Sequence, residues 1–395
     1  MNPKDTARST VVRHSESLVE LSHRIHAYPE LAFTEVNAAA WICDALEAGE
    51  FQVERGICSL PTAFAASSGS GDLTIAICVE FDALPDVGHA CGHNIIAAAA
   101  VAAGLALASV ADDVGIRVKV LGTPAQEGGG GKILMLERGV VDDVDAAMMV
   151  HPWPEEDAAP VTLAVSHLRI AYAGKAAHAS SYPEKGINAA DAMTVAQVAI
   201  RLLRQHTGSS QRIHGMVTDG GAAPNIVPAH TRAAYYVRAA NLTELALLEP
   251  RVRACFEAGA VATGCLREIE RASVPYSEFD HDMEIFTVYQ RNAEALGRVL
   301  PSEQVKFFPG STDMANISLA LSSIQPMLVI DCGDSGNHEP EFAKHCIEPS
   351  AGRALLTGGL AMAWTGVDMA CDTALRARLM AAGSARRSGA TPLAV

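Results

Sequence analysis

The chain has 395 residues, too many for one ordinary domain, and its 49% apolar and 19% charged residues are typical of a folded protein rather than a disordered one. The formal net charge of −15 gives no overall attraction for nucleic acid phosphates or anionic lipids, so neither nucleic acid nor membrane is expected as a partner. Residues 1–17 lack the apolar stretch of a secretion signal, and the nine cysteines lack the spacing of a disulfide framework, so we expect a cytoplasmic protein.

The first 150 residues alternate between helical and strand patterns. Apolar residues recur at helical spacing over 15–26 and 36–46. Short β-rich runs follow at 51–53, 73–79, 118–121 and 146–150, and helical segments lie between the later ones, over 94–108 and 132–138. This alternation predicts an α/β domain with a mostly parallel sheet, whose functional residues lie just past the carboxyl ends of the strands.

The middle of the chain has a different order of elements. We expect strands at 167–173, 211–218, 230–238 and 265–272, and helices at 186–204 and 244–259. This β-α-β-β-α-β order is that of a ferredoxin-like domain. After Pro275 the α/β pattern returns, with helices at 282–296 and 349–365 and a strand at 327–331. We therefore predict a small domain, 165–273, inserted into a larger one formed by 1–164 and 274–383, with a disordered tail at 384–395.

Residues of the kinds that bind metals follow several predicted strands. Cys91 and His93 lie one residue apart after the strand 73–79, and Glu127, His151 and His338 follow three other strands. Thiolate, imidazole and carboxylate groups suit zinc and other transition metals. One such residue alone is more often structural. Because a parallel sheet brings successive strand ends together, five of them predict a metal site.

Two other motifs are excluded by their context. The glycines at 128–131 and Lys132 resemble a phosphate-binding loop, but Gln126 stands where its first glycine belongs, and Ile133 replaces the hydroxyl residue that would hold magnesium. The G-D-S-G run at 333–336 resembles the nucleophile motif of trypsin-like proteases. In those enzymes the histidine precedes the serine and the fold is all β, neither of which fits this chain.

Several segments, in order between residues 23 and 342, resemble the dinuclear metallo-amidohydrolases, a family that includes aminoacylases, auxin-conjugate hydrolases and carboxypeptidase G. They are E-F-D-A-L-P, G-H-A-C-G-H-N, G-T-P-A-Q-E-G-G-G-G-K, M-V-H-P-W, G-K-A-A-H-A-S, H-G-M-V-T-D-G-G-A-A-P-N-I-V-P, G-S-T-D-M-A-N and N-H-E-P-E-F. Within the family, these motifs are most similar to those of p-aminobenzoyl-glutamate hydrolases and β-alanyl-lysine dipeptidases. The resemblance implies a catalytic α/β domain interrupted by a ferredoxin-like lid and dimerisation domain, and hence a homodimer or tetramer.

The resemblance also implies a metal centre. Cys91 stands at the position of a ligand that bridges two metals, and His93, Glu127, His151 and His338 stand at the remaining ligand positions. The implied cofactor is two divalent transition metal ions, and zinc, manganese, cobalt and nickel all suit this set.

Three further residues match functional positions of the family. Asp82 matches an aspartate held near the metals. His178 and Asn225 match lid residues that reach the active site of a neighbouring protomer and bind the oxyanion or the substrate carboxylate.

One position departs from the family pattern. The family has two adjacent glutamates, the first a general base and the second a ligand, whereas here the first is Gln126. An amide cannot accept a proton from water. Either the glutamine was introduced to trap a bound state or the natural chain lacks this base. We therefore expect a metal-dependent amidohydrolase that cleaves a small N-acyl amino acid or dipeptide-like substrate through a metal-bridging water, or, alternatively, a catalytically silent homologue that binds metal and ligand.

Overall fold

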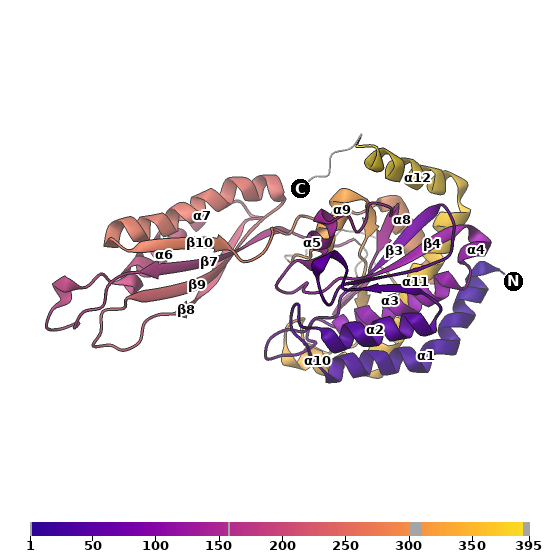
Figure 1. Ribbon diagram of the computed structural model, residues 1–395, viewed down its shortest axis with the longest axis horizontal. Helices are drawn as coiled ribbons and strands as arrows, with labels where there is room; N and C mark the ends of the chain where they lie inside the picture. The colour runs from indigo at the N-terminus through magenta and orange to yellow at the C-terminus, as the bar shows by residue number, and fades with distance from the viewer. Residues whose placement is uncertain (1, 157–158, 301–309, 390–395) are drawn as a thin grey trace. The chain divides into compact units, whose positions relative to one another are not determined.

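The computed structural model describes residues 2–156, 159–300 and 310–389 and divides the chain into two units. The larger unit combines 1–161, 279–308 and 312–395, and the smaller one combines 162–278 with 309–311. In Figure 1 the smaller unit carries the labels β7 to β10, α6 and α7, and the remaining labels belong to the larger unit. The predicted fold class, an α/β domain interrupted by a ferredoxin-like one, is confirmed.

A six-stranded sheet forms the centre of the described part of the larger unit, in the order β1-β2-β4-β3-β5-β11. Its strands are β1 (Gln52–Arg55), β2 (Phe64–Ser68), β3 (Leu73–Val79), β4 (Ile116–Gly122), β5 (Ala146–Met148) and β11 (Ser322–Ile324). Strand β3 pairs in parallel with β4 and β5, and β5 with β11. The sheet is therefore mostly parallel, with an antiparallel edge that β2 and β1 add beside β4.

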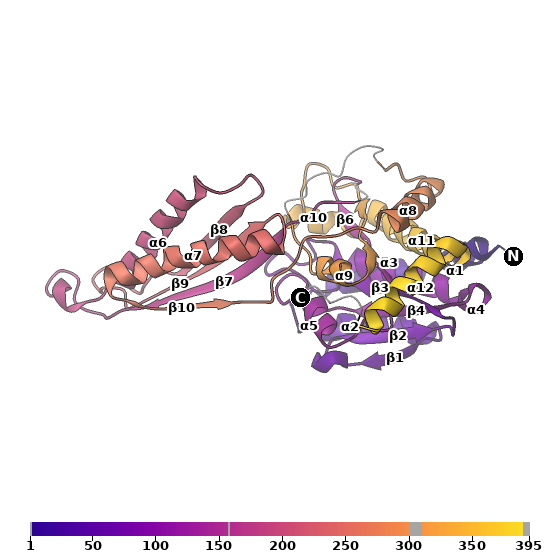
Figure 2. The ribbon, with the colours of Figure 1, turned by 90° about the horizontal axis from the view of Figure 1, so that it is seen from above.

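Strand β3 is buried along its whole length, which explains its continuous apolar run. Ile75 and Ile77 belong to one core cluster, together with residues of α1 (Pro3–Ala27), α2 (Val36–Ala48), α3 (His93–Ala108) and α11 (Pro349–Cys371). Ala76 and Cys78 point the other way, into a second cluster with residues of α9 (Met314–Ala320). Helices thus cover both faces of the sheet (Figures 1 and 2), and side chains at the ends of its strands are held from both sides.

The larger unit contains several further elements. They are α4 (Ala111–Val114), α5 (Gly131–Glu137), α8 (Met283–Ala295), α10 (Pro340–His345) and a small parallel sheet of β6 (His151–Trp153) and β12 (Met327–Val329). In the part of the chain that the structure describes, α11 is the one helix long and apolar enough to cross a membrane by length and composition, and 78% of that window is buried inside the protein.

The prediction of a disordered tail from residue 384 is wrong for its first residues. Helix α12 (Thr373–Arg387) continues through them because Asp372 caps its first turn and its last turn is fastened to the loop before β5. There Arg386 donates to the carbonyl of Val141, and Arg387 lies 3.0 Å from a carboxylate oxygen of Asp145. Residues 390–395 of the predicted tail lie outside the described residues.

The smaller unit is an antiparallel sheet in the order β10-β7-β9-β8, covered by two helices. Its elements in chain order are β7 (Ala164–Ala173), α6 (Ala189–Arg204), β8 (Arg212–Asp219), β9 (His230–Ala239), α7 (Leu242–Thr263) and β10 (Leu266–Arg271). One apolar cluster joins alternate residues of β7 and β9 to the inner faces of α6 and α7. Strand β8 lies at an edge of the sheet, and all of its side chains except Ile213 are exposed.

Candidate metal centre

The segment between β3 and α3 approaches the rest of the site closely at Gly92. This glycine precedes α3 with a φ of 76°, and a Cβ atom there would lie 2.5 Å from Cγ of Pro152. Only glycine tolerates both the backbone conformation and the contact. Glycine at 92 therefore lets the segment that carries Cys91 and His93 pack against the strand that begins at His151.

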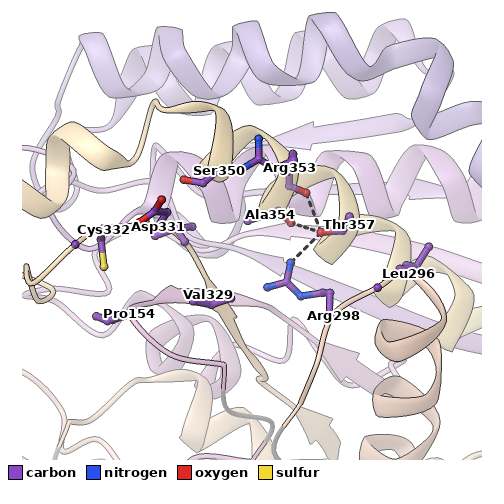
Figure 3. Close-up of a pocket in the computed structure, with 13 residues that line it drawn as sticks. Pro154, Leu296, Arg298, Val329, Asp331, Cys332, Ser350, Arg353, Ala354 and Thr357 are labelled. Carbon is purple, nitrogen blue, oxygen red and sulfur yellow. Dashed lines mark hydrogen bonds between the residues drawn. The ribbon is translucent and has the colours of Figure 1, made fainter.

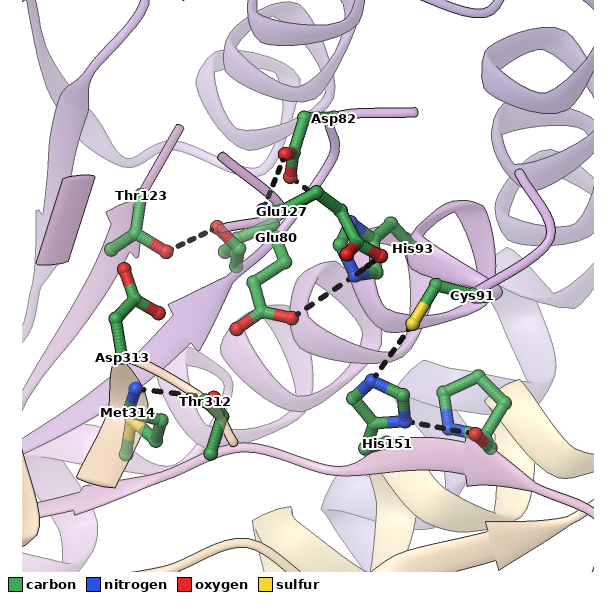
Figure 4. Close-up of polar contacts among 12 residues, drawn as sticks. Glu80, Asp82, Cys91, His93, Thr123, Glu127, His151, Thr312, Asp313 and Met314 are labelled. Carbon is green, nitrogen blue, oxygen red and sulfur yellow. Dashed lines mark hydrogen bonds and ion pairs between the residues drawn. The ribbon is translucent and has the colours of Figure 1, made fainter. Parts of the chain in front are cut away.

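Cys91 belongs to two groups of potential metal ligands. One is formed with His93 and His151 and the other with Glu127 and His338, and in each group the three ligand atoms lie within 4.8 Å of one another. Cys91 Sγ is 3.4 Å from His151 Nε2. Figure 4 marks this contact with a dashed line. A single sulfur shared by two groups is the arrangement that a ligand bridging two ions requires.

Both buried histidines are oriented through their Nδ1 atoms. His93 Nδ1 lies 3.0 Å from Oδ1 of Asp82, and His151 Nδ1 donates to the carbonyl of Pro152 at 2.8 Å. In each ring this leaves Nε2 as the ligand atom, which is how proteins commonly orient metal-binding histidines. Burial lowers the pKa of His151 to about 4, so the ring is neutral at pH 7 and its Nε2 lone pair is free for a metal.

Asp82 fixes two parts of the centre at once. Its second oxygen, Oδ2, accepts the backbone N–H of Glu127 at 2.9 Å (Figure 4). Burial opposes ionisation of Asp82, but the hydrogen bond and charge of His93 outweigh it and lower the pKa of this carboxyl. The aspartate expected near the metals thus lies against the predicted ligands without being in either group.

The residues present fit a pair of divalent transition metal ions. His93 Nε2 and Glu127 Oε1 are buried without a hydrogen-bond partner, although they lie 3.8 Å apart. Burial raises the pKa of Glu127, and burial with the charge of Glu127 raises the pKa of Cys91 to about 12. Buried polar groups without a partner destabilise the folded protein, and a divalent cation would provide the missing partner. Sulfur, imidazole and carboxylate donors are those that zinc, manganese, cobalt or nickel accept.

His338 lies at the open side of the centre, with 55% of its side chain exposed, and its Nε2 is 3.6 Å from Glu127 Oε1. Its φ of 72° is unusual for a residue with a Cβ atom, and its backbone N–H donates to the carbonyl of Ala90 at 2.8 Å. Such strain persists where surrounding contacts enforce it, often at functional sites. Here the contact with Ala90 ties His338 to the segment that carries Cys91.

Gln126 is buried in the turn that leads from β4 to Glu127, with 6% of its surface exposed. The residue before it, Ala125, has a φ of 61°, and its N–H donates to Glu35 Oε1 at 2.9 Å. Burial and the nearby charge of Asp82 raise the pKa of Glu35 to about 7. Glu35 thus holds a strained turn that determines where Gln126 and Glu127 point.

The two predicted substrate-binding residues lie in the smaller unit and are brought together there. The segments of His178 and Asn225 pair through a bridge between His178 and Ile226 and through the N–H of Ala179, which donates to the carbonyl of Asn225 at 3.0 Å. His178 Nδ1 accepts the N–H of Ser181 at 3.2 Å, which leaves Nε2 at the exposed edge of the ring.

Sequence reasoning missed a buried cluster of charges beside the predicted ligands. Lys132 Nζ donates to Glu80 Oε1 at 2.6 Å and to Asp313 Oδ1 at 2.7 Å, and all three side chains are inaccessible to solvent. The other oxygen of the glutamate, Glu80 Oε2, is 3.4 Å from His93 Nε2 (Figure 4). A lysine in a glycine-rich stretch and an acidic residue two positions before Asp82 were the signals in the sequence.

A separate cavity of about 600 Å³ lies near the start of α11 (Figure 3). Arg298 in this cavity is bound to Glu156 at 2.6 Å and to Thr357 at 2.9 Å, so its charge is already satisfied. None of the predicted site residues lines this cavity. The described geometry therefore gives it no part in the metal centre.

Comparisons with known proteins indicate the family of this chain. Residues 77–353 match the model of Peptidase family M20/M25/M40. The chain is 36% identical over 389 residues to Xaa-Arg dipeptidase from Mus musculus, covering 94% of this chain and 90% of that protein. It is 34% identical over 267 residues to one of the polypeptides of p-aminobenzoyl-glutamate hydrolase from Escherichia coli K12, covering 62% of this chain and 55% of that polypeptide.

Two solved structures share the fold. One is a dinuclear metal binding peptidase of the M20 family from Bacillus subtilis, with a TM-score of 0.64 and 20% identity over 89% of this chain and 98% of that one. The other is an aminobenzoyl-glutamate utilization protein from Klebsiella pneumoniae, with a TM-score of 0.70 and 17% identity over 90% of this chain and 97% of that one.

Proposed function

We propose that the substrates of this protein are dipeptides with a basic C-terminal residue. The premise is that the chain belongs to Peptidase family M20/M25/M40 and is a metal-dependent hydrolase of carbon–nitrogen bonds in small amide substrates. The main support is the 36% identity to Xaa-Arg dipeptidase, which extends over 94% of the chain. The formal net charge of −15 adds to it, since an acidic protein attracts cationic substrates.

The observation that carries the proposal is the place of Cys91 in both ligand groups. We assign one ion to Cys91, His93 and His151 and the other to Cys91, Glu127 and His338. Two divalent ions so held would supply a Lewis acid for the amide carbonyl and would lower the pKa of water. The metal is one of zinc, manganese, cobalt and nickel, the ions that this mixed donor set accepts.

The side chains around the centre then have separate tasks. Asp82 keeps His93 in the tautomer that presents Nε2, and its contact with the Glu127 backbone keeps the second ligand turned inward. His178 Nε2 and the Asn225 side chain are proposed to hold the oxyanion or the carboxylate of the substrate, because both are exposed and adjacent in the smaller unit. The Gln126 amide can hydrogen-bond to water or substrate but accepts no proton.

Gln126 also favours a second candidate function. A chain that keeps the ligands and lacks the proton acceptor is suited to binding a dipeptide without rapid turnover. The two functions share the metal centre and differ in the rate of the chemical step.

We further propose a cytoplasmic homodimer or tetramer joined through the smaller unit. The support is the exposed edge strand β8, whose unpaired backbone groups form a surface that proteins usually cover. All nine cysteines are free, as expected in a reducing compartment.

A substrate panel tests the function directly. The metal-loaded protein is assayed against dipeptides ending in arginine, lysine or leucine, against p-aminobenzoyl-glutamate and against N-acetyl amino acids, with and without a chelator. We expect the highest kcat/KM for the arginine and lysine dipeptides and loss of activity with the chelator. Equal rates for leucine and arginine would contradict the proposed specificity, and chelator-resistant hydrolysis would contradict the metal centre.

A further inference from the structure

Three buried polar atoms of the candidate centre have no hydrogen-bond partner. They are Glu80 Oε2, His93 Nε2 and Glu127 Oε1. His93 Nε2 is 3.4 Å from the first oxygen and 3.8 Å from the second. Buried polar atoms are nearly always paired in folded proteins, so orphaned atoms this close to His93 Nε2 mark a place for a cation.

Glu80 differs from a carboxylate that merely neutralises a lysine. Only Oε1 receives a hydrogen bond from Lys132, at 2.6 Å, whereas Oε2 faces His93. The side chain begins directly after β3, one residue beyond Val79, so its backbone is part of the rigid end of the sheet. Its position is therefore held by the strand on one side and by the lysine on the other.

The charges around Lys132 do not balance. Asp313 accepts hydrogen bonds from both the backbone N–H and the Nζ of Lys132, at 3.0 and 2.7 Å, so both of its oxygens act as acceptors and the carboxylate is ionised. Burial opposes the charge on Lys132, but Asp313 and Glu80 outweigh it and raise the pKa of this lysine. Two carboxylates and one ammonium leave one negative charge in a region without solvent access, and a cation beside Glu80, either a metal ion or the protonated ring of His93, must balance it.

From these contacts we propose that Glu80 is a further ligand of the metal centre, whose Oε2 binds the ion that His93 Nε2 binds. Two donors, each about 2.1 Å from one ion, lie about 3.0 to 3.4 Å apart at octahedral or tetrahedral angles, and the observed separation is 3.4 Å. Lys132 prevents Glu80 from turning away, and Asp313 holds Lys132. An added carboxylate oxygen favours ions that accept more than four ligands, such as manganese or cobalt, over tetrahedral zinc.

This inference rests on the proposed two-metal function, and metal binding tests it without relying on turnover. Metal-free protein is titrated with Co²⁺, and the affinity, the stoichiometry and the visible absorption of the bound ion are recorded for wild type and Glu80→Gln. The amide keeps the shape of the side chain and removes its charge. We expect one of the two ions to bind about 10- to 100-fold more weakly in the variant, with a changed absorption spectrum.

Asp145→Asn is the matched control. It removes a buried carboxylate that accepts the backbone N–H of Thr74 and pairs with Arg387, and that contacts neither Lys132 nor His93. We expect both ions to bind this variant within about threefold of wild type. Wild-type affinity and spectrum in Glu80→Gln would overturn the proposal, and so would an equal loss in both variants, since that would be a general effect of removing a buried carboxylate.

A crystal structure of the manganese-loaded wild-type protein decides the question even if Glu80→Gln fails to fold. We expect Glu80 Oε2 within about 2.5 Å of an ion, and a separation above about 3.5 Å would overturn the ligand assignment. Wild-type protein that binds two ions and hydrolyses dipeptides while Glu80 stands apart contradicts this inference alone. Wild-type protein that binds no metal contradicts the proposed function itself.

Discussion

Asp82 Oδ1 lies 3.0 Å from Nδ1 of His93, and both side chains are buried at the end of β3. The contact determines which nitrogen of His93 faces the centre. Because the other oxygen of Asp82 holds the backbone of Glu127, this carboxylate couples one ligand of each proposed ion.

Asp82→Asn should weaken metal binding about 10- to 100-fold, because a neutral amide neither favours the Nδ1–H tautomer of His93 nor holds the Glu127 backbone as firmly. Calorimetric titration with Mn²⁺ measures the effect. The matched control is Asp86→Asn, an exposed residue of the same loop, which should bind as wild type does. Equal affinities in the two variants would exclude an orienting role for Asp82.

Cys91→Ala should lower the metal content of the purified protein from two ions per chain towards one or none, since its thiolate is the atom shared by both groups. Metal content is measured by mass spectrometry of the purified, dialysed protein. Cys371→Ala removes an exposed free cysteine on the same chain and should leave the content unchanged. If Cys91→Ala retains two ions, the cysteine is not a bridging ligand.

Gln126→Glu should raise kcat by about 100- to 10,000-fold, because general-base catalysis contributes about that much, while KM changes little. Glutamine and glutamate have nearly the same shape, so the substitution should preserve both metal binding by Glu127 and binding of the substrate to the protein. Steady-state kinetics on the best dipeptide of the panel gives both constants. Gln52→Glu, at an exposed position of β1, controls for the added charge.

If the wild-type protein turns over its substrate rapidly and Gln126→Glu has the same kcat, another group accepts the proton. Asp82 is the nearest alternative that the sequence suggests. A gain in kcat that Gln52→Glu does not share would instead support Gln126 as the position of the missing base.

The protein should behave as a dimer or tetramer in light scattering at micromolar concentration. Replacing Met216 and Val217 on the edge strand β8 with lysine should shift it towards the monomer, because lysines on an edge strand disfavour pairing. Leu266→Lys on β10, the opposite edge of the sheet, is the control for added charge and should leave the assembly intact. A monomeric wild-type protein would contradict the proposal.

Stability of the metal-free protein should fall below pH 6.5 through His167. Burial, together with the positive charge of Arg238 and His214, lowers the pKa of His167 to about 4, and its Nδ1 lies 2.8 Å from the hydroxyl of Ser273. Because the folded pKa lies below the ordinary value of 6.5, the unfolded chain takes up a proton first as the pH falls. The stability that the neutral ring contributes is therefore complete above pH 6.5 and decreases towards pH 4.

The effect is measured by urea unfolding of wild type and His167→Gln at several pH values. Between pH 6.5 and 5 the advantage of wild type over the variant should shrink by about 1.5 kcal/mol, because each pKa unit corresponds to about 1.4 kcal/mol and the unfolded ring is half protonated at pH 6.5. Histidines that do not interact with His167 affect both proteins alike and cancel in the difference. A difference that is independent of pH would show that His167 is readily protonated in the folded protein.

Local patterns in the sequence were sufficient for the fold class and for the composition of the candidate centre. The apolar run of β3 appears in the sequence because the strand is buried on both faces, and its predicted bounds agree with the structure. Cys91, His93 and Glu127 were identifiable because parallel strands end at the same edge of a sheet. Strand β2 was missed because its residues, F-A-A-S-S, are mostly small and have weak strand preference.

The remaining features depend on contacts between residues far apart in the chain, which no local pattern encodes. Lys132 and Asp313 are 181 residues apart, and only their contact turns a lysine of a glycine-rich loop into a buried cation. Arg386 extends α12 because it reaches Val141, 245 residues away. The sequence by itself determined which groups are available for metal binding. The tertiary structure decided how they are oriented, because hydrogen bonds and burial depend on what surrounds each side chain in space.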